Sequence, residues 1–398
     1  MGNLTKNIYI SLVLVFCFTG SFSQDYSLDN RFYKTIDWNE FFNLLEKNPR
    51  LVFFDIRTPG ERNDTSQYSA NNQGRIRGAK QINYFEFARY YADLLKHKQD
   101  TIYLYCSHSM RSRRLAKQLA DSSFKNVVSV NGGMSYLNLL GNKTFPLRRK
   151  YYETNIKYNL ISPANLVTKL KNSKVQVIDV RPDSIYFGAG GDEQDNSYGY
   201  IKGIKHIDPS KCADSISLFD KNKETILIDT YGDISPLIAN QLIEKGFKNV
   251  GVLFFGLDEL RSTVPSYKRS YLQLKYPAIL SSELVDLKKD GNVAIIDIRT
   301  ETEFNSTDTV AWKNVGRLKD AVNIPVSKFS EKALQPYRNK KLVIYDNMMM
   351  PPELYQAAEL LRKYGVKDFA LLSGGVFQIN WELANTGKKY LQSLLDKK

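Results

Sequence analysis

The sequence predicts an α/β fold made of three tandem domains, each a mostly parallel sheet flanked by helices. An apolar run that ends in Asp-x-Arg occurs three times, at residues 51–57, 175–181 and 293–299. Near-continuous apolar runs are typical of strands buried on both faces of a parallel sheet. Each run follows a helical pattern, at residues 38–45, 163–170 and 282–287. Strands that alternate with helices in this way predict parallel α/β units.

Three further blocks repeat in the same order within each copy. They are a glycine turn (74–79, 199–204 and 316–321), an apolar strand (101–105, 225–229 and 341–345) and a strand with a glycine turn ending at residues 133, 256 and 375. The Asp residues of the Asp-x-Arg blocks are 124 and 118 positions apart, which is a domain-sized period. We therefore expect a leader over 1–24 and domains over 25–150, 151–268 and 269–398.

The composition is that of a folded globular protein, with 42% hydrophobic and 25% charged residues. The formal net charge is +14 at pH 7, which favours anionic small molecules and surfaces. The basic residues are spread along the chain instead of forming one block, so we expect a solvated basic exterior and no nucleic-acid partner.

The first 24 residues have the layout of a secretory signal peptide. Lys6 supplies a positive charge, residues 8–18 are apolar, and Ser21 and Ser23 provide small residues where a signal peptidase cleaves. The apolar run has 11 residues, too few to span a bilayer. A lipid anchor on Cys17 is disfavoured because bulky Phe16 precedes it. We expect a secreted or periplasmic protein with no stable membrane insertion once the signal is removed.

The strongest chemical signal is Cys106, which directly follows the apolar strand 101–105. A short polar loop comes next, then a helix expected to begin near residues 112–114. A thiol at this point lies near loop N–H groups and a helix N-terminus, which favour its thiolate form. Arg111 adds a permanent positive charge. Export leaves one further thiol, Cys212, with which Cys106 could pair, although we expect Cys212 to be a partly exposed structural thiol.

The same spacing locates the equivalent position in the other two copies. Cys106 lies 51 residues after Asp55, and counting 51 residues from Asp179 reaches Thr230. Counting 49 residues from Asp297 reaches Asp346. We therefore expect copies two and three to have lost the thiol, and neither of their loops carries an arginine at the position of Arg111.

Taken together, these motifs resemble the rhodanese family. Its hallmarks are an Asp-x-Arg strand end, a Gly-x-Ile-x-Gly-Ala turn and a Cys-x-x-Gly-x-Arg loop ahead of a helix. Here they read as residues 55–57, 74–79 and 106–111. The chain departs from the pattern at Ser109, which replaces the usual Gly, and at Arg75 and Arg77, which make the turn more basic. A serine at that position is strained if the backbone needs φ > 0.

The resemblance implies a sulfurtransferase with Cys106 as nucleophile and persulfide carrier. Arg111 would bind an anionic, thiosulfate-like donor, and a thiol or cyanide would accept the sulfur. The loop around the thiol would form the substrate-binding cradle, mainly through its backbone N–H groups: Ser107, His108, Ser109, Met110 and Ser112. We expect neither a cofactor nor a metal.

Two other functions fit the same loop. Some phosphatases share the fold with five residues between Cys and Arg, whereas this chain has four. A scaffold or binding protein is the other alternative, since two copies lack the thiol.

Asp55 and Arg57 are interpreted as an ion pair that braces the loop, with Arg75 at its rim. His108 could be a proton donor or a solvent-facing side chain. A copper(I) site at Met348, Met349 and Met350 is disfavoured, because adjacent residues rarely converge on one metal. Residues 187–196 are acidic and glycine-rich, which predicts a mobile surface loop.

Overall fold

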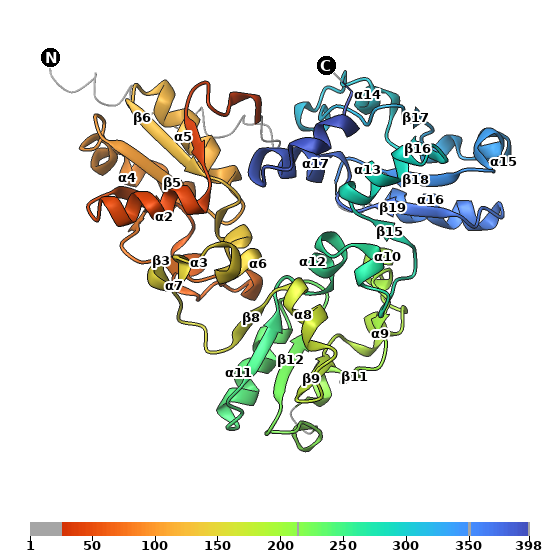
Figure 1. The fold of residues 1–398 in the computed structure, drawn as a ribbon, viewed down its shortest axis with the longest axis horizontal. Helices are drawn as coiled ribbons and strands as arrows, with labels where there is room; N and C mark the ends of the chain where they lie inside the picture. Colours follow the sequence, from red (N-terminus) through yellow and green to blue (C-terminus); the bar gives the residue numbers. More distant parts are fainter. Residues whose placement is uncertain (1–25, 213–214, 349–351, 397–398) are drawn as a thin grey trace, which may run out of the picture.

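The computed structural model describes residues 26–212, 215–348 and 352–396, which form three lobes arranged around a common centre (Figure 1). The predicted leader at 1–24 lies outside the described residues, as do Met349 and Met350. Each lobe is built on a five-stranded sheet in which every strand pairing is parallel, so the predicted α/β class with three tandem domains is confirmed.

Domain 1 has the strand order β1-β6-β5-β2-β4. Its strands are β1 (Lys34–Ile36), β2 (Val52–Asp55), β4 (Lys80–Gln81), β5 (Thr101–Tyr105) and β6 (Asn126–Val130). Its helices are α2 (Trp38–Lys47), α3 (Pro59–Asn63), α4 (Phe87–Leu95), α5 (Met110–Asp121), α6 (Gly133–Thr144) and α7 (Arg148–Tyr151).

Two hydrophobic cores form on the two faces of this sheet because successive strand residues point to opposite sides. Tyr103 and Tyr105 pack with the apolar residues of α2 and α6. Ile102 and Leu104 pack on the other face with α4 and α5. The apolar side chains of β5 are therefore buried on both faces of the sheet, as its sequence predicts.

Domains 2 and 3 repeat this arrangement. Domain 2 has the order β11-β9-β12-β13-β8 and contains β8 (Asn159–Ile161), β9 (Val175–Asp179), β11 (Lys205–His206), β12 (Glu224–Ile228), β13 (Val250–Leu253), α8 (Pro163–Lys169), α9 (Asp183–Tyr186), α10 (Glu193–Asn196), α11 (Ser235–Glu244) and α12 (Gly256–Thr263). Domain 3 has the order β15-β19-β18-β16-β17 and contains β15 (Ala278–Ile279), β16 (Val293–Asp297), β17 (Val322–Asn323), β18 (Lys341–Tyr345), β19 (Phe369–Leu372), α13 (Ser281–Lys289), α14 (Glu301–Phe304), α15 (Glu331–Leu334), α16 (Pro352–Lys363) and α17 (Gly375–Asn385).

Short antiparallel strand pairs connect the end of one domain to its own glycine turn. β3 (Arg75–Ile76) pairs with β7 (Tyr152–Glu153), and β10 (Tyr200–Ile201) pairs with β14 (Leu272–Gln273). The segments just after residues 150 and 268 thus still pair with the preceding domain.

The Asp-x-Arg block forms the same buried ion pair in every domain. Asp55 and Arg57 are both fully buried, with Arg57 Nη2 2.6 Å from Asp55 Oδ2 and 2.6 Å from the carbonyl oxygen of Gly74. Arg181 reaches the Gly199 carbonyl in the same way, and Arg299 reaches that of Gly316. The pair therefore ties a strand end to the glycine turn, which explains why the two motifs repeat together.

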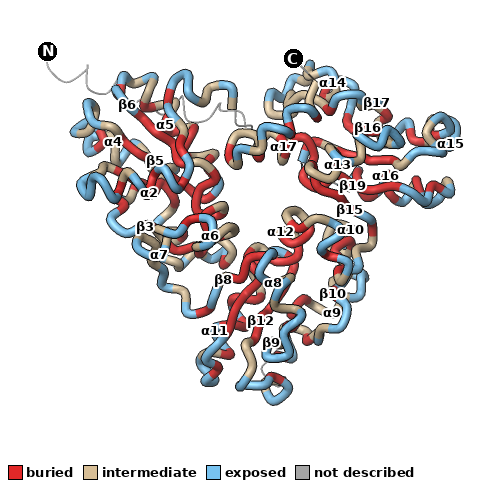
Figure 2. Tube along the Cα trace, in the orientation of Figure 1, coloured by how far each residue is buried: buried red, intermediate tan, exposed pale blue. Residues whose placement is uncertain are grey.

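The three domains meet at the centre of the molecule. Helix α17 of domain 3 lies against domain 1, and α12 of domain 2 points to the same region (Figure 1). In Figure 2 the buried positions lie mainly along the strands inside each lobe, whereas the exposed positions lie mostly along its outer rim. The predicted mobile loop at 187–196 is partly structured, since α10 forms there and Glu193 accepts a hydrogen bond from Tyr276 of domain 3. In the described residues, no helix has the length and apolar character needed to cross a membrane.

Candidate active site

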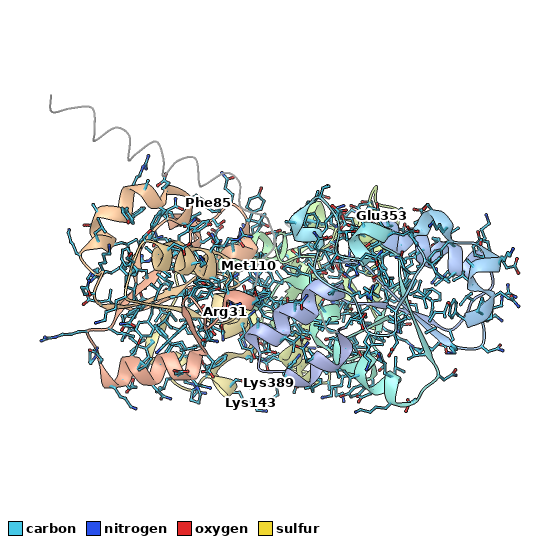
Figure 3. All side chains as sticks on the ribbon, turned by 90° about the horizontal axis from the view of Figure 1, so that it is seen from above. Arg31, Phe85, Met110, Lys143, Glu353 and Lys389 are labelled. Atoms are coloured by element: carbon cyan, nitrogen blue, oxygen red, sulfur yellow. The ribbon has the colours of Figure 1, made fainter. Side chains whose placement is uncertain are left out.

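Cys106 immediately follows β5 and lies beneath the loop that leads into α5. The helix begins at Met110, earlier than the predicted start near residues 112–114. Cys106 is only 1% exposed, and its thiol donates its one hydrogen bond, at 3.8 Å, to the hydroxyl of Ser112. Within the described part of the chain, no backbone N–H donates to this sulfur. Met110 is seen near the middle of the molecule, where domain 1 meets its neighbours (Figure 3).

Ser109 adopts a left-handed backbone conformation, with φ 66°, which is unfavourable for residues other than glycine. Two hydrogen bonds of its hydroxyl stabilise the serine in this conformation. Ser109 Oγ donates to Asn385 Oδ1 at 2.6 Å and accepts from Arg113 Nη1 at 2.5 Å. Asn385 is the last residue of α17, so domain 3 directly holds the loop of domain 1.

Arg111 is bound by Glu61, a residue that was not singled out from the sequence. Arg111 Nη1 donates to Glu61 Oε2 at 2.8 Å, and Nη2 donates to Oε1 at 2.6 Å. The hydroxyl of Ser107 donates to Glu61 Oε1 at 2.9 Å and accepts from Arg111 Nη2 at 2.8 Å. Burial alone would raise the pKa of Glu61, but the Arg111 guanidinium and the other donors outweigh it and lower this pKa to about 2.

His108 lies where all three domains come together. Its Nε2 is 3.0 Å from Ser135 Oγ, and its ring packs against that of Phe255 from domain 2 at 5.7 Å. Trp381 of domain 3 donates its indole N–H to the His108 carbonyl at 3.2 Å. The surrounding protein, with Arg111 nearby, lowers the pKa of His108 to about 4. At this pKa the imidazole is neutral at pH 7, and its side chain is in contact with solvent.

The remaining predicted site residues hold the framework. Asp55 and Arg57 bind each other and the Gly74 turn, as described above. Arg75 donates to Glu153 of β7 at 2.8 Å, so its charge is used in the β3–β7 pairing instead of at the rim of the loop.

The structure corrects the register of the second copy. The N–H of Met134 donates to the carbonyl of Cys106, and the N–H of Leu257, at the equivalent place in α12, donates to that of Asp229. Val376 makes the same bond to Asp346. Asp229, and not Thr230, is therefore the counterpart of Cys106. The count of 51 residues was wrong because domain 2 is one residue shorter over this stretch.

Asp229 fills the loop of domain 2 with its own carboxylate. Oδ1 accepts the N–H of Gly232 at 2.5 Å, and Oδ2 accepts those of Ile234 at 2.5 Å and Ser235 at 2.7 Å. Burial raises the pKa of this carboxyl, and the three N–H donors oppose the rise. These donors are three, five and six residues after Asp229, and therefore correspond to Ser109, Arg111 and Ser112 in domain 1.

The third copy also carries a carboxyl group at this position. The N–H of Asn347 donates to Asp346, and burial raises the pKa of Asp346 to about 6. The described part of the chain holds no group of three or more His, Cys, Asp or Glu residues that could bind a metal.

The two described cysteines are both free. Cys212 is 2% exposed, more buried than predicted, and its sulfur lies 3.8 Å from the carbonyl oxygen of Ile207. Burial raises its pKa to about 11. Cys212 is thus an inert counterpart to Cys106.

A signal for Glu61 was present in the sequence. Thr58 and Glu61 have the Thr-x-x-Glu spacing of a capping box at the start of a helix, and Thr300 and Glu303 repeat it in domain 3. No comparable pattern marks Asn385, because it lies 276 residues from the serine that it binds.

Comparison with known families gives three matches along the chain. The model of the rhodanese-like domain matches residues 37–138, 162–263 and 280–381, one match in each of the three structural domains.

Similar proteins are found at low sequence identity. Thiosulfate sulfurtransferase GlpE of Pseudomonas aeruginosa is 30% identical over 100 residues, which are 25% of this chain and 82% of that protein. The protein of the same name from Pseudomonas entomophila is 29% identical over 108 residues, 27% of this chain and 89% of its own length. Among solved structures, an EanB variant in complex with ergothioneine matches 89% of this chain and 98% of its own at 14% identity, with a TM-score of 0.28.

Proposed function

Because the chain belongs to the rhodanese-like domain family, we propose that its first domain is a sulfurtransferase that carries sulfane sulfur as a persulfide on Cys106. The donor is an anionic sulfane-sulfur compound, such as thiosulfate or a persulfide. The acceptor is a thiol or cyanide.

The observation that carries this proposal is the carboxylate of Asp229 in the sibling loop. Each carboxylate oxygen is two bonds from Cβ, and the outer sulfur of a cysteine persulfide is also two bonds from Cβ. In domain 2 these oxygens accept three loop N–H bonds. The equivalent N–H groups of domain 1 belong to Ser109, Arg111 and Ser112. A loop of this shape therefore suits an anionic atom one bond beyond Sγ, which is the negative end of a persulfide.

The transfer balances without a redox partner. The Cys106 thiolate attacks the outer sulfur of the donor, a bond from Sγ to that sulfur forms, and the donor's S–S bond breaks. The bonding electron pair leaves with sulfite when the donor is thiosulfate, or with a thiolate when it is a persulfide. The acceptor thiolate then attacks the outer sulfur of the Cys106 persulfide and restores the Cys106 thiolate.

Three neighbours have defined parts in this scheme. Ser112 holds the sulfur through its hydroxyl, which is itself hydrogen bonded to Ser129 at 2.8 Å. Arg111, in its ion pair with Glu61, holds the loop beside the thiolate through its bond to Ser107 Oγ. His108 is neutral at pH 7, so it lines the loop and is not a cationic proton donor.

A scaffold function is the second candidate, and the burial of Cys106 favours it. A side chain that is 1% exposed must become accessible before it can react. In this alternative the three domains would form a binding module, and the thiol would be a remnant.

The test is a sulfur-transfer assay on residues 25–398 with Cys106→Ser, using Cys212→Ser as a matched control at the other buried thiol. We expect C106S to lower sulfide or thiocyanate production by at least about a thousandfold, as for loss of a nucleophile, and C212S to leave it unchanged. Mass spectrometry after exposure to donor should show a gain of about 32 Da, one sulfur atom, on Cys106. Hydrolysis of a phosphate ester without sulfur transfer would indicate a phosphatase. The absence of activity in both assays would indicate a scaffold.

We also propose that residues 1–24 direct export and are removed. N-terminal sequencing of the protein isolated from its native cells tests this, since a mature chain beginning near Gln24 or Asp25 is expected and an intact Met1 would overturn it.

A further inference from the structure

The guanidinium of Arg111 is already paired before any donor arrives. Both terminal nitrogens donate to Glu61, at 2.8 and 2.6 Å. The Arg111 side chain is 18% exposed and that of Glu61 is 8% exposed. The pair is therefore a fixed part of the site, and the two charges cancel locally.

Glu61 is held in place from several sides. Its Oε2 accepts the N–H of Thr58 at 2.9 Å, which closes the cap of α3, and its Oε1 accepts the hydroxyl of Ser107 at 2.9 Å. The neighbouring residue of Ser107 in the chain is Cys106 itself. A carboxylate with four donors stays ionised at every pH at which a thiolate exists.

The cap of the helix does not need an arginine in the loop. In domain 3, Glu303 forms the same capping box with Thr300, but its carboxylate pairs with Lys313 at 3.0 Å. In domain 2, Ile185 stands at the position of Glu61 and Ile234 at that of Arg111. Only domain 1, which keeps the thiol, combines the carboxylate with the loop arginine.

We propose that Glu61 selects the sulfur donor by charge, so that the site prefers a singly charged persulfide of a small thiol over doubly charged thiosulfate. This rests on the proposed function. The sulfonate end of thiosulfate would need the paired N–H groups of Arg111, which Glu61 occupies, and its two charges would face a fixed carboxylate. A persulfide presents one negative charge and needs no such pair, because loop N–H groups suffice for it.

The experiment compares kcat/KM for thiosulfate and for the persulfide of 2-mercaptoethanol, whose only charge is on its terminal sulfur, in the wild type, Glu61→Gln and Glu303→Gln. Glutamine keeps an acceptor oxygen for the N–H of Thr58, and E303Q makes the same change in the matched helix cap of domain 3. We expect the wild type to favour the persulfide by about tenfold or more, the effect of one unit of charge at such a site. We expect E61Q to raise kcat/KM for thiosulfate by about tenfold, with little change for the persulfide, and E303Q to change neither.

A charge-preserving variant separates charge from geometry. Glu61→Asp retains the negative charge one methylene further from Arg111, so thiosulfate should remain disfavoured. The proposal is overturned if the wild type uses thiosulfate as well as the persulfide, if E61Q alters both donors alike, or if E61D behaves as E61Q does. The wild-type comparison holds even if a variant fails to fold. Absence of transfer from both donors would instead count against the sulfurtransferase function itself.

Discussion

Asn385 allows the contact between domains 1 and 3 to be tested quantitatively. Its Oδ1 accepts three hydrogen bonds from domain 1: from Ser109 Oγ at 2.6 Å, Arg113 Nη1 at 2.8 Å and the N–H of Gly132 at 2.9 Å. Asn385 is 4% exposed. Asn385→Ala removes this oxygen and leaves two of the donors without any other partner, since Arg113 Nη1 keeps its bond to Ser109.

The expected loss follows from those two donors. A buried donor left unpaired costs about 1–3 kcal/mol, so N385A should destabilise the contact by about 3 kcal/mol. Ser109→Gly should cost about 1 kcal/mol, because losing two hydrogen bonds (about 1 kcal/mol each) is partly offset by relief of a left-handed serine (about 1 kcal/mol). In the S109G background N385A should again cost about 3 kcal/mol, because it then leaves Arg113 Nη1 and the N–H of Gly132 unpaired, so the two losses should add to within about 0.5 kcal/mol.

Calorimetry and hydrogen exchange together measure these effects, since a chain of three domains is not expected to unfold in one step. The amides of residues 107–113 should exchange about a hundredfold faster in N385A, the equivalent of about 3 kcal/mol. Asn380→Ala is the control, because Asn380 lies on the same helix but donates to Val315 within domain 3. Unchanged exchange of the loop in N385A, or a loss in the S109G background that differs from the loss in the wild-type background by more than about 1 kcal/mol, would refute the reasoning.

Three further outcomes are expected. Asp55→Ala should lower the stability of domain 1 by about 3–5 kcal/mol in urea titration, because it leaves the buried Arg57 uncompensated; a loss below 1 kcal/mol contradicts this. Glu61, whose pKa is lowered to about 2, contributes stability above its unfolded pKa of about 4.3 and loses it as pH falls toward 2. The stability difference between wild type and E61Q, measured by urea titration from pH 6 to 2.5, should therefore shrink on acidification, and a constant difference speaks against it. Asp229→Asn should destabilise domain 2 by about 2 kcal/mol in calorimetry, since its amide NH₂ would meet loop N–H donors; an unchanged transition argues otherwise.

The fold could be predicted because its signals are local and repeated. The apolar strands, the helix patterns before them and the Asp-x-Arg blocks recur in order, and each appears in the structure at the expected residues. The start of α5 was placed too late because Ser109 can take the left-handed conformation, which lets the helix begin at Met110. The counterpart of Cys106 was misplaced by one residue, since counting from Asp179 assumes loops of equal length.

Contacts between residues far apart in the sequence could not be predicted in this way, because no local pattern marks which residues meet. The sequence showed Arg111 and its charge, but not that Glu61, 50 residues earlier, would bind it. Arg75 was expected at the site from its place in a motif, yet its partner Glu153 belongs to the segment that closes the domain. Charge and motif identify which groups are available, whereas only the packed chain determines which of them meet.

The two thiol-less domains account for features of the first that its own sequence leaves unexplained. A serine in the left-handed region is unfavourable unless its surroundings hold it there. Asn385 of domain 3 stabilises this conformation by accepting a hydrogen bond from the Ser109 hydroxyl, and Trp381 donates one to the adjacent carbonyl of His108. Domain 2 contributes Phe255 against the ring of His108, while its own loop is closed by Asp229. The two copies without the thiol therefore support the loop of the copy that keeps it, so Cys106 and its partners form one site built by three domains.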